Sequence, residues 1–498
     1  MIEGPGQSRL LNTPGVGARQ RRQGMAQASL PPLTVTLVVF AALHLWLALH
    51  LPLVADETYY ALWATAPAAG YYDHPPMIAW WIWAGERLFG PTALGVRLVS
   101  VLAFAALTPL VGRMARIATG GDRRAGRIAA LFVNAMALVL VLGFTATPDS
   151  PSVFFWALTL WAAMEAVADP ARAGRWWLLA GLAAGLGVLS KFTNLFLWVG
   201  LVGWLVATAD GRAMLRRPVV WAAAALALAV LIPYARWNLA HDGLGLTRQF
   251  GRIDSGTSAG LRWLLDYLGT SIALVTPLIL MLIPGGVQRA RGGARLILWL
   301  TAPLVLYMAI HAIHAQVQAN WLVPLYPGLA VLAALAARER PDRATLLAAA
   351  TGIAIGLGAL ALAFAPGAPV FPGPNTPNET KGWSPVLADL RAAMQASGAR
   401  WIATDTYGLT GRFSFALPGV PVWSVVEPQR YLFRGPIPAR LCAAPGLLVT
   451  LDTPQSDVLA RFATHGTGLA LERRAGGALL QRYTATPVQG LAGCGTTP

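Results

Sequence analysis

The chain of 498 residues is organised by long hydrophobic runs that alternate with short polar segments. Most of these runs are long enough to cross the roughly 30 Å hydrocarbon core of a bilayer as a helix. The predicted spans are 33–54, 94–112, 128–146, 151–168, 176–190, 192–209, 219–235, 261–283, 296–313, 321–337 and 345–365. The pattern therefore predicts a mainly α, polytopic membrane bundle of about eleven transmembrane helices.

The polar segments between the predicted spans alternate in their arginine content. Clusters of arginine follow every second span, at 113–127, 172–175, 212–217, 289–295 and 338–343. The positive-inside rule places such clusters in the cytoplasm. We therefore expect the N-terminus inside, and the arginine-poor segments outside.

The apolar segment 75–89 does not fit the alternation as a span. If it crossed the membrane, the cluster at Arg123 and Arg124 would face outward, against the charge rule. At this length, and with Trp80, Trp81 and Trp83, it fits a helix that lies at headgroup depth. We therefore expect a first external loop of about forty residues along the membrane surface.

Beyond residue 365 the hydropathy falls and proline and glycine become frequent. Strand-like runs at 401–404 and 447–450, with a helical pattern at 385–396, predict a small α/β domain. The expected organisation is a disordered cytoplasmic N-terminus (1–32), a transmembrane domain (33–365) and an extracytoplasmic domain (366–498). Cys442 and Cys494 form either a disulfide there or two buried thiols.

Composition narrows the classes of function. Hydrophobic residues make up 56% of the chain and charged residues 12%, which excludes an ordinary soluble enzyme. The net charge is +16 and the pI about 10.8, but the basic residues lie between the spans and do not gather in one segment. We therefore expect the lipid bilayer as a partner and no nucleic acid. A glycine-rich nucleotide-binding fingerprint is also missing from the sequence.

Candidate chemistry lies on the predicted external side. Asp56 and Glu57 follow the first span, and Asp149 returns to the same side between the third and fourth spans. Carboxylates at a membrane surface are costly unless they are hydrated, paired or used, so a solvated loop is the alternative. Lys191 is one of only two lysines in the chain and suits a phosphate contact, with a snorkelling residue as the alternative.

Two further external segments carry weaker signals. Arg236 and Asn238 either contribute to a pocket or form the end of a helix that snorkels to the interface. Asn320, beside Trp321, either binds sugar hydroxyls or belongs to an interfacial aromatic belt. Neither segment settles a function by itself.

The order of these motifs resembles the bacterial glycosyltransferase family 39 type, which includes protein O-mannosyltransferases and lipid A aminoarabinose transferases. The resemblance covers residues 33 to about 365. The motifs that carry it are Asp56-Glu57-Thr58-Tyr59-Tyr60, Tyr71-Tyr72-Asp73-His74-Pro75-Pro76, Thr147-Pro148-Asp149, Gly185 to Thr193, Arg236 to Asp242 and Gln318-Ala319-Asn320-Trp321.

The resemblance implies a GT-C fold in the bacterial inner membrane, a polyprenyl-phosphate sugar donor and inversion at the anomeric carbon. The acceptor would be lipid A, a protein or a cell-envelope glycan. Asp56 would be the general base, and Glu57 would support it or bind a divalent metal ion. Asp149 would orient substrate or donor, and Lys191 would bind the donor phosphate, with His74 as an extra contact to it. The substrate-binding residues would be Tyr59, Tyr60, Arg236, Asn238 and Asn320.

The chemistry of the transfer agrees with these roles. A phosphate leaving group departs without protonation, so one carboxylate base and one cation are enough. A transporter or flippase of lipid-linked sugars is the alternative function, but such proteins usually show inverted repeats and ionisable residues near the bilayer centre. A sugar-polymer ligase would differ only in its acceptor. An external binding module would not need eleven spans as its anchor.

Overall fold

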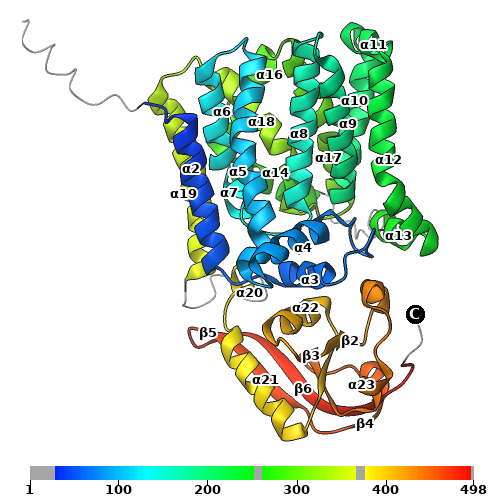
Figure 1. Ribbon diagram of the computed structural model, residues 1–498. Helices are drawn as coiled ribbons and strands as arrows, with labels where there is room; N and C mark the ends of the chain where they lie inside the picture. The colour runs from blue at the N-terminus through cyan, green and yellow to red at the C-terminus, as the bar shows by residue number, and fades with distance from the viewer. Residues whose placement is uncertain (1–28, 252–260, 366–375, 495–498) are drawn as a thin grey trace, which may run out of the picture.

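The computed structural model describes residues 29–251, 261–365 and 376–494, so the predicted disorder of the N-terminus falls almost entirely outside the described residues. Helices form a bundle above a small sheet domain (Figure 1). The bundle helices are α2 (Leu33–His50), α5 (Ala93–Ala118), α6 (Arg123–Ala135), α7 (Ala137–Leu142), α8 (Asp149–Ala168), α9 (Ala173–Ser190), α10 (Leu195–Ala207), α11 (Ala209–Leu215), α12 (Pro218–Ala240), α13 (Leu244–Gly251), α14 (Leu261–Val275), α15 (Pro277–Leu280), α16 (Ile283–Arg289), α17 (Arg295–His314), α18 (Tyr326–Ala337) and α19 (Asp342–Phe364). Short 3-10 turns lie at η1 (Phe192–Asn194), η2 (Gly292–Ala294) and η3 (Ala319–Leu325).

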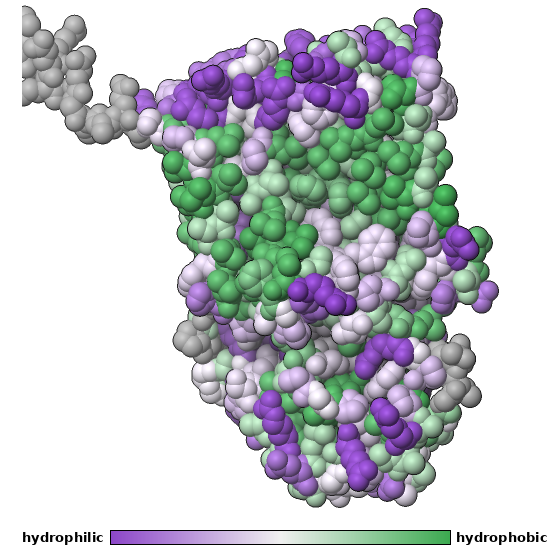
Figure 2. Space-filling view, viewed as in Figure 1, coloured by the Kyte–Doolittle hydropathy of each residue, from purple (hydrophilic) through white to green (hydrophobic). Residues whose placement is uncertain are grey.

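The bundle is that of a multi-pass membrane protein. Eight of its described helices are long and apolar enough to cross a membrane, and two bent helix pairs raise the number to ten. On the face shown in Figure 2, a hydrophobic band separates a hydrophilic rim from the sheet domain. Such a band is expected where helices meet lipid.

The third predicted span, 128–146, differs from the expectation of one helix. It divides into α6 and α7 at Met136, whose backbone is extended (φ −61°, ψ 123°). Both pieces are almost wholly buried inside the bundle. Buried neighbours can satisfy the backbone groups that such a break releases, so the interruption is tolerated at membrane depth. The described helices therefore give eight to ten candidate spans, close to the predicted number of about eleven, and the broken segment α6–α7 is not among them.

Polar contacts join several helix ends at the hydrophilic rim. Arg124, in the first turn of α6, forms an ion pair with Asp342 at the start of α19. The other oxygen of Asp342 accepts a hydrogen bond from the Leu30 backbone N–H (3.1 Å), just before α2. Arg124 Nε also donates to the carbonyl of Arg338 at the end of α18 (3.1 Å). The starts of α2, α6 and α19 therefore lie at one end of the bundle, as the alternation of arginine predicts.

Small residues allow neighbouring helices to pack closely. At the contact between α9 and α12, a Cβ on Gly181 would lie 2.2 Å from the carbonyl oxygen of Ala223. One turn further along, a Cβ on Gly185 would lie 2.7 Å from the carbonyl oxygen of Ala227. Small residues at such contacts let membrane helices gain van der Waals contact that lipid cannot supply. The end of α9, which carries Lys191, is thereby fixed.

Two helices lie across the opposite end of the bundle, between the spans and the sheet domain (Figure 1). They are α3 (Ala55–Ala64) and α4 (Met77–Phe89). The second has thirteen residues and is not among the candidate spans, as expected for the predicted interfacial helix. Trp80 donates its ring N–H to the carbonyl of Ala68 (3.0 Å), which ties α4 to the loop after α3.

The sheet domain is built on six strands in the order β2-β1-β3-β6-β4, with β5 also paired to β6. The strands β1 (Trp401–Thr404), β2 (Val422–Ser424) and β3 (Gly446–Leu451) are parallel, and β6 (Ala478–Leu491) runs antiparallel to β3, β4 (Phe462–His465) and β5 (Leu469–Ala475). The remaining elements are α20 (Thr376–Glu379), α21 (Trp383–Ser397), α22 (Tyr407–Ala416), η4 (Pro428–Arg434), α23 (Ala439–Ala443) and α24 (Ser456–Leu459). Cys442 and Cys494 form a disulfide, so of the two alternatives the structure has the paired form.

Candidate active site

Asp149 and Lys191 form an ion pair at the end of the bundle that faces the sheet domain. Lys191 Nζ lies 2.7 Å from Asp149 Oδ1, and the two side chains are 11% and 5% exposed. Asn320, in η3, donates its amide to the other oxygen of Asp149 (2.6 Å). Three predicted site residues from distant parts of the chain are therefore brought together.

Helix ends position both charges. Asp149 lies in the first turn of α8, where the partial positive charge of a helix N-terminus favours a carboxylate. Lys191 is the C-cap of α9, where the partial negative charge favours an ammonium group. Asn194 links the end of α9 to α8. Its backbone N–H donates to the Lys191 carbonyl (3.0 Å), and its side-chain amide donates to Ser152 Oγ (2.6 Å). The pair is thus set in a rigid frame.

Asp56 lies in the first turn of α3, at the surface that meets the sheet domain. Its Oδ1 accepts a hydrogen bond from the hydroxyl of Tyr407 in α22 (3.1 Å). Burial raises the pKa of the Asp56 carboxyl to about 6, the Tyr407 hydrogen bond opposes that rise, and the charges of nearby Glu379, Asp73 and Asp149 add to it. A carboxylate with a pKa in this range is suited to accept a proton near neutral pH.

Glu57 occupies a different environment from its neighbour. It is fully buried, and its two oxygens accept hydrogen bonds from Arg97 Nε (2.7 Å) and Nη2 (2.5 Å). The backbone N–H groups of Val54 and Ala146 donate to the same oxygens, each at 3.0 Å. With four donors, this carboxylate is not placed to act on a substrate or to ligate a metal ion. Across the described ranges, no three His, Cys, Asp or Glu side chains are grouped as a metal site.

Asp73 was not among the predicted site residues, but it contacts several other residues at this surface. It is buried and accepts a hydrogen bond from the Tyr59 hydroxyl (2.9 Å). Arg430, in η4 of the sheet domain, forms an ion pair with it, and Arg248 of α13 lies 3.5 Å away. Gln249 donates to its backbone carbonyl. Its place beside His74, within a motif already singled out, was the signal that could have identified it.

The predicted substrate contacts Tyr59 and Tyr60 and the predicted donor-phosphate contact His74 lie at the same surface. Both tyrosines are buried, and burial raises the pKa of each hydroxyl well above its usual value. The rings of Tyr60 and His74 meet edge to face, with centroids 6.2 Å apart. Tyr59 is already committed to Asp73, so it orders the loop rather than presenting a free hydroxyl.

Arg236 and Asn238 lie at the corner between α12 and α13. Arg236 is exposed. The amide of Asn238 is buried, donates to the carbonyl of Tyr234 (3.0 Å) and accepts from the N–H of Leu246 (3.2 Å). Asn238 therefore serves the turn between two helices, and the described contacts do not bring either residue to Asp56.

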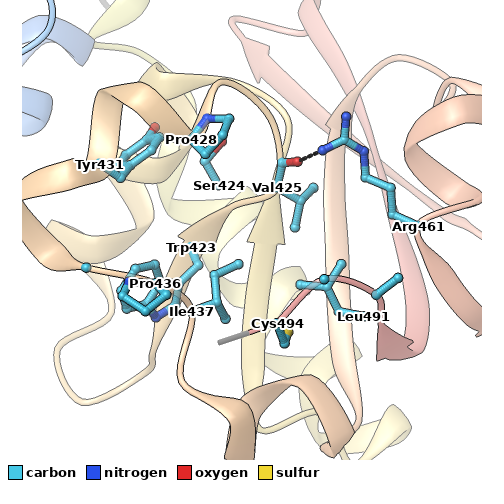
Figure 3. A pocket seen from close by; sticks show the side chains of 13 residues that line it. Trp423, Ser424, Val425, Pro428, Tyr431, Pro436, Ile437, Arg461, Leu491 and Cys494 are labelled. Atoms are coloured by element: carbon cyan, nitrogen blue, oxygen red, sulfur yellow. Dashed lines mark hydrogen bonds between the residues drawn. The ribbon is translucent and has the colours of Figure 1, made fainter. Parts of the chain in front are cut away.

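The sheet domain holds a separate pocket of ≈ 240 Å³ behind η4 (Figure 3). Trp423, Tyr431 and Pro436 contribute to its lining, and Arg461 donates to the Val425 carbonyl at its rim. Tyr431 follows Arg430 in the chain, so this pocket adjoins the segment that reaches Asp73.

Comparison with known proteins gives the fold of the chain. Residues 73–237 match the family described as dolichyl-phosphate-mannose-protein mannosyltransferase. The crystal structure of ArnT from Cupriavidus metallidurans in the apo state aligns with 91% of this chain and 97% of its own, with a TM-score of 0.64 and 16% identity. The same protein bound to undecaprenyl phosphate aligns with 92% and 98%, with a TM-score of 0.63 and 17% identity. The chain therefore has the ArnT fold, and the predicted GT-C bundle is confirmed.

Two relatives of known activity are similar over part of their length. A lipid A galacturonosyltransferase of Rhizobium johnstonii is 30% identical over 286 residues, which are 56% of this chain and 59% of that protein. An undecaprenyl phosphate-alpha-4-amino-4-deoxy-L-arabinose arabinosyl transferase of Pseudomonas fluorescens is 26% identical over 317 residues, which are 55% and 54%. The chain thus matches a little over half the length of these curated relatives. The predicted resemblance to membrane glycosyltransferases is confirmed.

Proposed function

We propose that this chain is an inverting membrane glycosyltransferase that moves a sugar from a polyprenyl-phosphate carrier to an acceptor outside the cytoplasm. The observation that carries the proposal is the arrangement at one end of the bundle. A half-buried carboxylate with a pKa of about 6, Asp56, lies on the same surface as a buried ammonium group, Lys191. The ArnT fold and the matches to polyprenyl-phosphate sugar transferases support it.

In the proposed reaction, Asp56 accepts the proton of the acceptor hydroxyl while the acceptor oxygen bonds to the anomeric carbon. The bond from that carbon to the carrier phosphate breaks, and the phosphate leaves with the electron pair. One base is enough because the phosphate needs no proton to depart. Attack opposite the leaving group inverts the anomeric centre.

Lys191 is proposed to stabilise the charge that grows on the departing phosphate. A fixed cation in a poorly hydrated site is effective because no solvent has to reorganise during the reaction. Asp149 holds this ammonium group at 2.7 Å, and Asn320 in turn holds Asp149. Both are proposed to position Lys191. Tyr60 is proposed to contact substrate and His74 the donor phosphate, and their rings meet edge to face.

Undecaprenyl phosphate is the proposed carrier, because the name of the Pseudomonas fluorescens relative gives an undecaprenyl-phosphate sugar donor. Lipid A is the proposed acceptor class, because the Rhizobium johnstonii relative is a lipid A glycosyltransferase. Proposed roles for Arg236 and Asn238 in substrate binding find no support in their contacts. We further propose that residues 33–365 form the glycosyltransferase domain that holds the base and the phosphate-binding lysine.

The proposed orientation puts the arginine-rich end in the cytoplasm and residues 366–498 outside the bacterial inner membrane. The arginine clusters favour it, and so does the Cys442–Cys494 disulfide, since disulfides persist in oxidising compartments. Alkaline phosphatase fused near Gly398 should be active in cells, and the same fusion near Asp122 inactive. The reverse result would move the site to the cytoplasm.

Glycolipid analysis of a deletion strain tests the function. One undecaprenyl-phosphate sugar should accumulate, and the corresponding sugar should disappear from an envelope acceptor. Restoration by the wild-type gene, but not by an Asp56→Asn variant, would connect the phenotype to the site. If the deletion leaves both the carrier pool and the envelope sugars unchanged, the proposal is wrong.

A further inference from the structure

The sheet domain packs closely on the helix that carries Asp56. Where α22 crosses α3, a Cβ on Gly411 would lie only 2.6 Å from the backbone nitrogen of Tyr59. Next to it, the buried Arg412 donates to the carbonyl of Leu53 (2.6 Å). A backbone approach of this kind needs glycine, because any other residue would have to separate the two helices. The sheet domain is therefore docked onto the site.

The docked helix presents one hydroxyl to the site. Tyr407, the first residue of α22, donates to Asp56 Oδ1 at 3.1 Å. Its ring packs against that of Tyr59 (centroids 5.0 Å apart), and the guanidinium of Arg430 lies 5.0 Å from its centre. Two neighbours thus restrict the ring and aim its hydroxyl. Among the described residues, Tyr407 is the one hydrogen-bond partner of the Asp56 carboxylate.

We propose that Tyr407 is a positioning residue for the base, and that the docked sheet domain is consequently part of the catalytic unit. This inference rests on the proposed function. The Tyr407 hydroxyl holds Oδ1, which fixes the carboxylate rotamer and leaves Oδ2 for the hydroxyl of the acceptor. The hydrogen bond also stabilises the ionised carboxylate, which is the form that accepts a proton.

The surroundings of Asp56 make this hydroxyl important. The titratable groups that face the carboxylate come from four helices and one loop. They are Tyr60 of α3, Asp73 in the loop before α4, Asp149 of α8, Glu379 of α20 and Tyr407 of α22. The three carboxylates and burial favour the protonated form, and the Tyr407 hydrogen bond opposes them. Without that hydroxyl, the pKa of Asp56 should rise further above 6, and less of the base would be ionised at any given pH.

The test is the pH dependence of sugar transfer by Tyr407→Phe, measured with reconstituted full-length protein and undecaprenyl-phosphate sugar. In the pH–rate profile, we expect the fall in activity on the acidic side to occur about one pH unit higher than in the wild type. Turnover at pH 5 would then be about ten-fold lower. The difference should shrink as the pH rises. The KM for donor should not change, because Tyr407 faces the base. Tyr483→Phe is the matched control, since it also removes a buried phenol hydroxyl, one that accepts from Arg473 (3.2 Å).

A second variant tests the docking without altering either hydrogen-bonding group. Gly411→Ala must move α22 away from α3 and should shift the fall in activity on the acidic side in the same direction. Gly466→Ala is its control, because a Cβ there meets its nearest neighbour at an ordinary 3.5 Å.

The outcomes separate this inference from the proposed function. If wild-type protein transfers sugar and Tyr407→Phe keeps the wild-type pH profile, the inference alone is overturned. A uniform loss at every pH would make Tyr407 merely structural, and faster transfer would make its hydroxyl a competitor of the acceptor. Either result overturns the positioning role. Absence of transfer by wild-type protein from every donor tried would instead count against the proposed function.

Discussion

Replacement of Lys191 by methionine should lower both stability and turnover, through two separable effects. The ammonium group is 2.7 Å from Asp149, and both side chains are nearly inaccessible. Breaking a buried pair leaves one charge without a partner, which typically costs about 3–5 kcal/mol of folding free energy. If Lys191 also stabilises the departing phosphate, loss of that preorganised charge should lower turnover by about 10²–10³-fold.

A double variant separates the two effects. Lys191→Met combined with Asp149→Asn removes both charges, and the new amide carbonyl can still accept from Asn320. Its thermal stability should recover most of the loss, because no charge remains unpaired. Turnover should stay low, because the cation is still missing.

The assay is sugar transfer at varied donor concentration, with thermal unfolding of the same purified samples. Arg289→Ala is the control, because its exposed ion pair with Glu339 lies at the far end of the bundle and is screened by solvent, so its loss should barely change stability. If the double variant regains wild-type turnover together with stability, Lys191 serves only to neutralise Asp149. Full activity in Lys191→Met alone would refute the phosphate contact as well.

Three further predictions follow from the same contacts. Asp56→Asn should lower turnover by about 10²–10⁴-fold. Wild-type activity should fall as the pH drops through about 6, where the base becomes protonated. Both expectations are checked by pH–rate profiles of the two proteins. Replacing Cys442 and Cys494 by serine opens a crosslink across 52 residues and should lower stability by up to about 4 kcal/mol, measured by thermal melting. Arg97→Ala should cost about 3–5 kcal/mol, because Glu57 would remain buried without its cation, and should reduce the yield of monodisperse protein.

Hydropathy and arginine content predicted most of the bundle. The thickness of the bilayer sets the length of each apolar run, and the positive-inside rule sets which connecting segments carry arginine. The prediction that α4 does not cross the membrane followed from parity, since a crossing there would have inverted every later loop, and from the short length of the segment. The break at Met136 was not visible, because the sequence stays apolar through it. Hydropathy measures transfer into lipid and carries no information about a bend that buried neighbours stabilise.

The candidate site was predicted only in part. The position of a residue relative to the predicted spans indicates its depth in the membrane, but not which other side chains it contacts. Asp149, Lys191 and Asn320 were each expected at the outer boundary, and the structure joins them. The resemblance assigned Asp56 as the base and Glu57 as its support or a metal ligand, but the sequence did not show that helix α3 turns Asp56 toward the sheet domain and Glu57 toward Arg97. The contacts from Tyr407 to Asp56 and from Arg430 to Asp73 span 351 and 357 residues, beyond any local pattern.

The central claim is that the bond between sugar and carrier phosphate is broken by this protein. The most direct measurement uses proteoliposomes that contain the purified chain, a labelled undecaprenyl-phosphate sugar and a lipid A acceptor, with release of undecaprenyl phosphate as the readout. We expect release of the carrier in step with labelling of the acceptor by wild-type protein, and neither by Asp56→Asn. Movement of the intact donor across the bilayer without cleavage, equal in wild type and Asp56→Asn, would contradict it and favour a flippase.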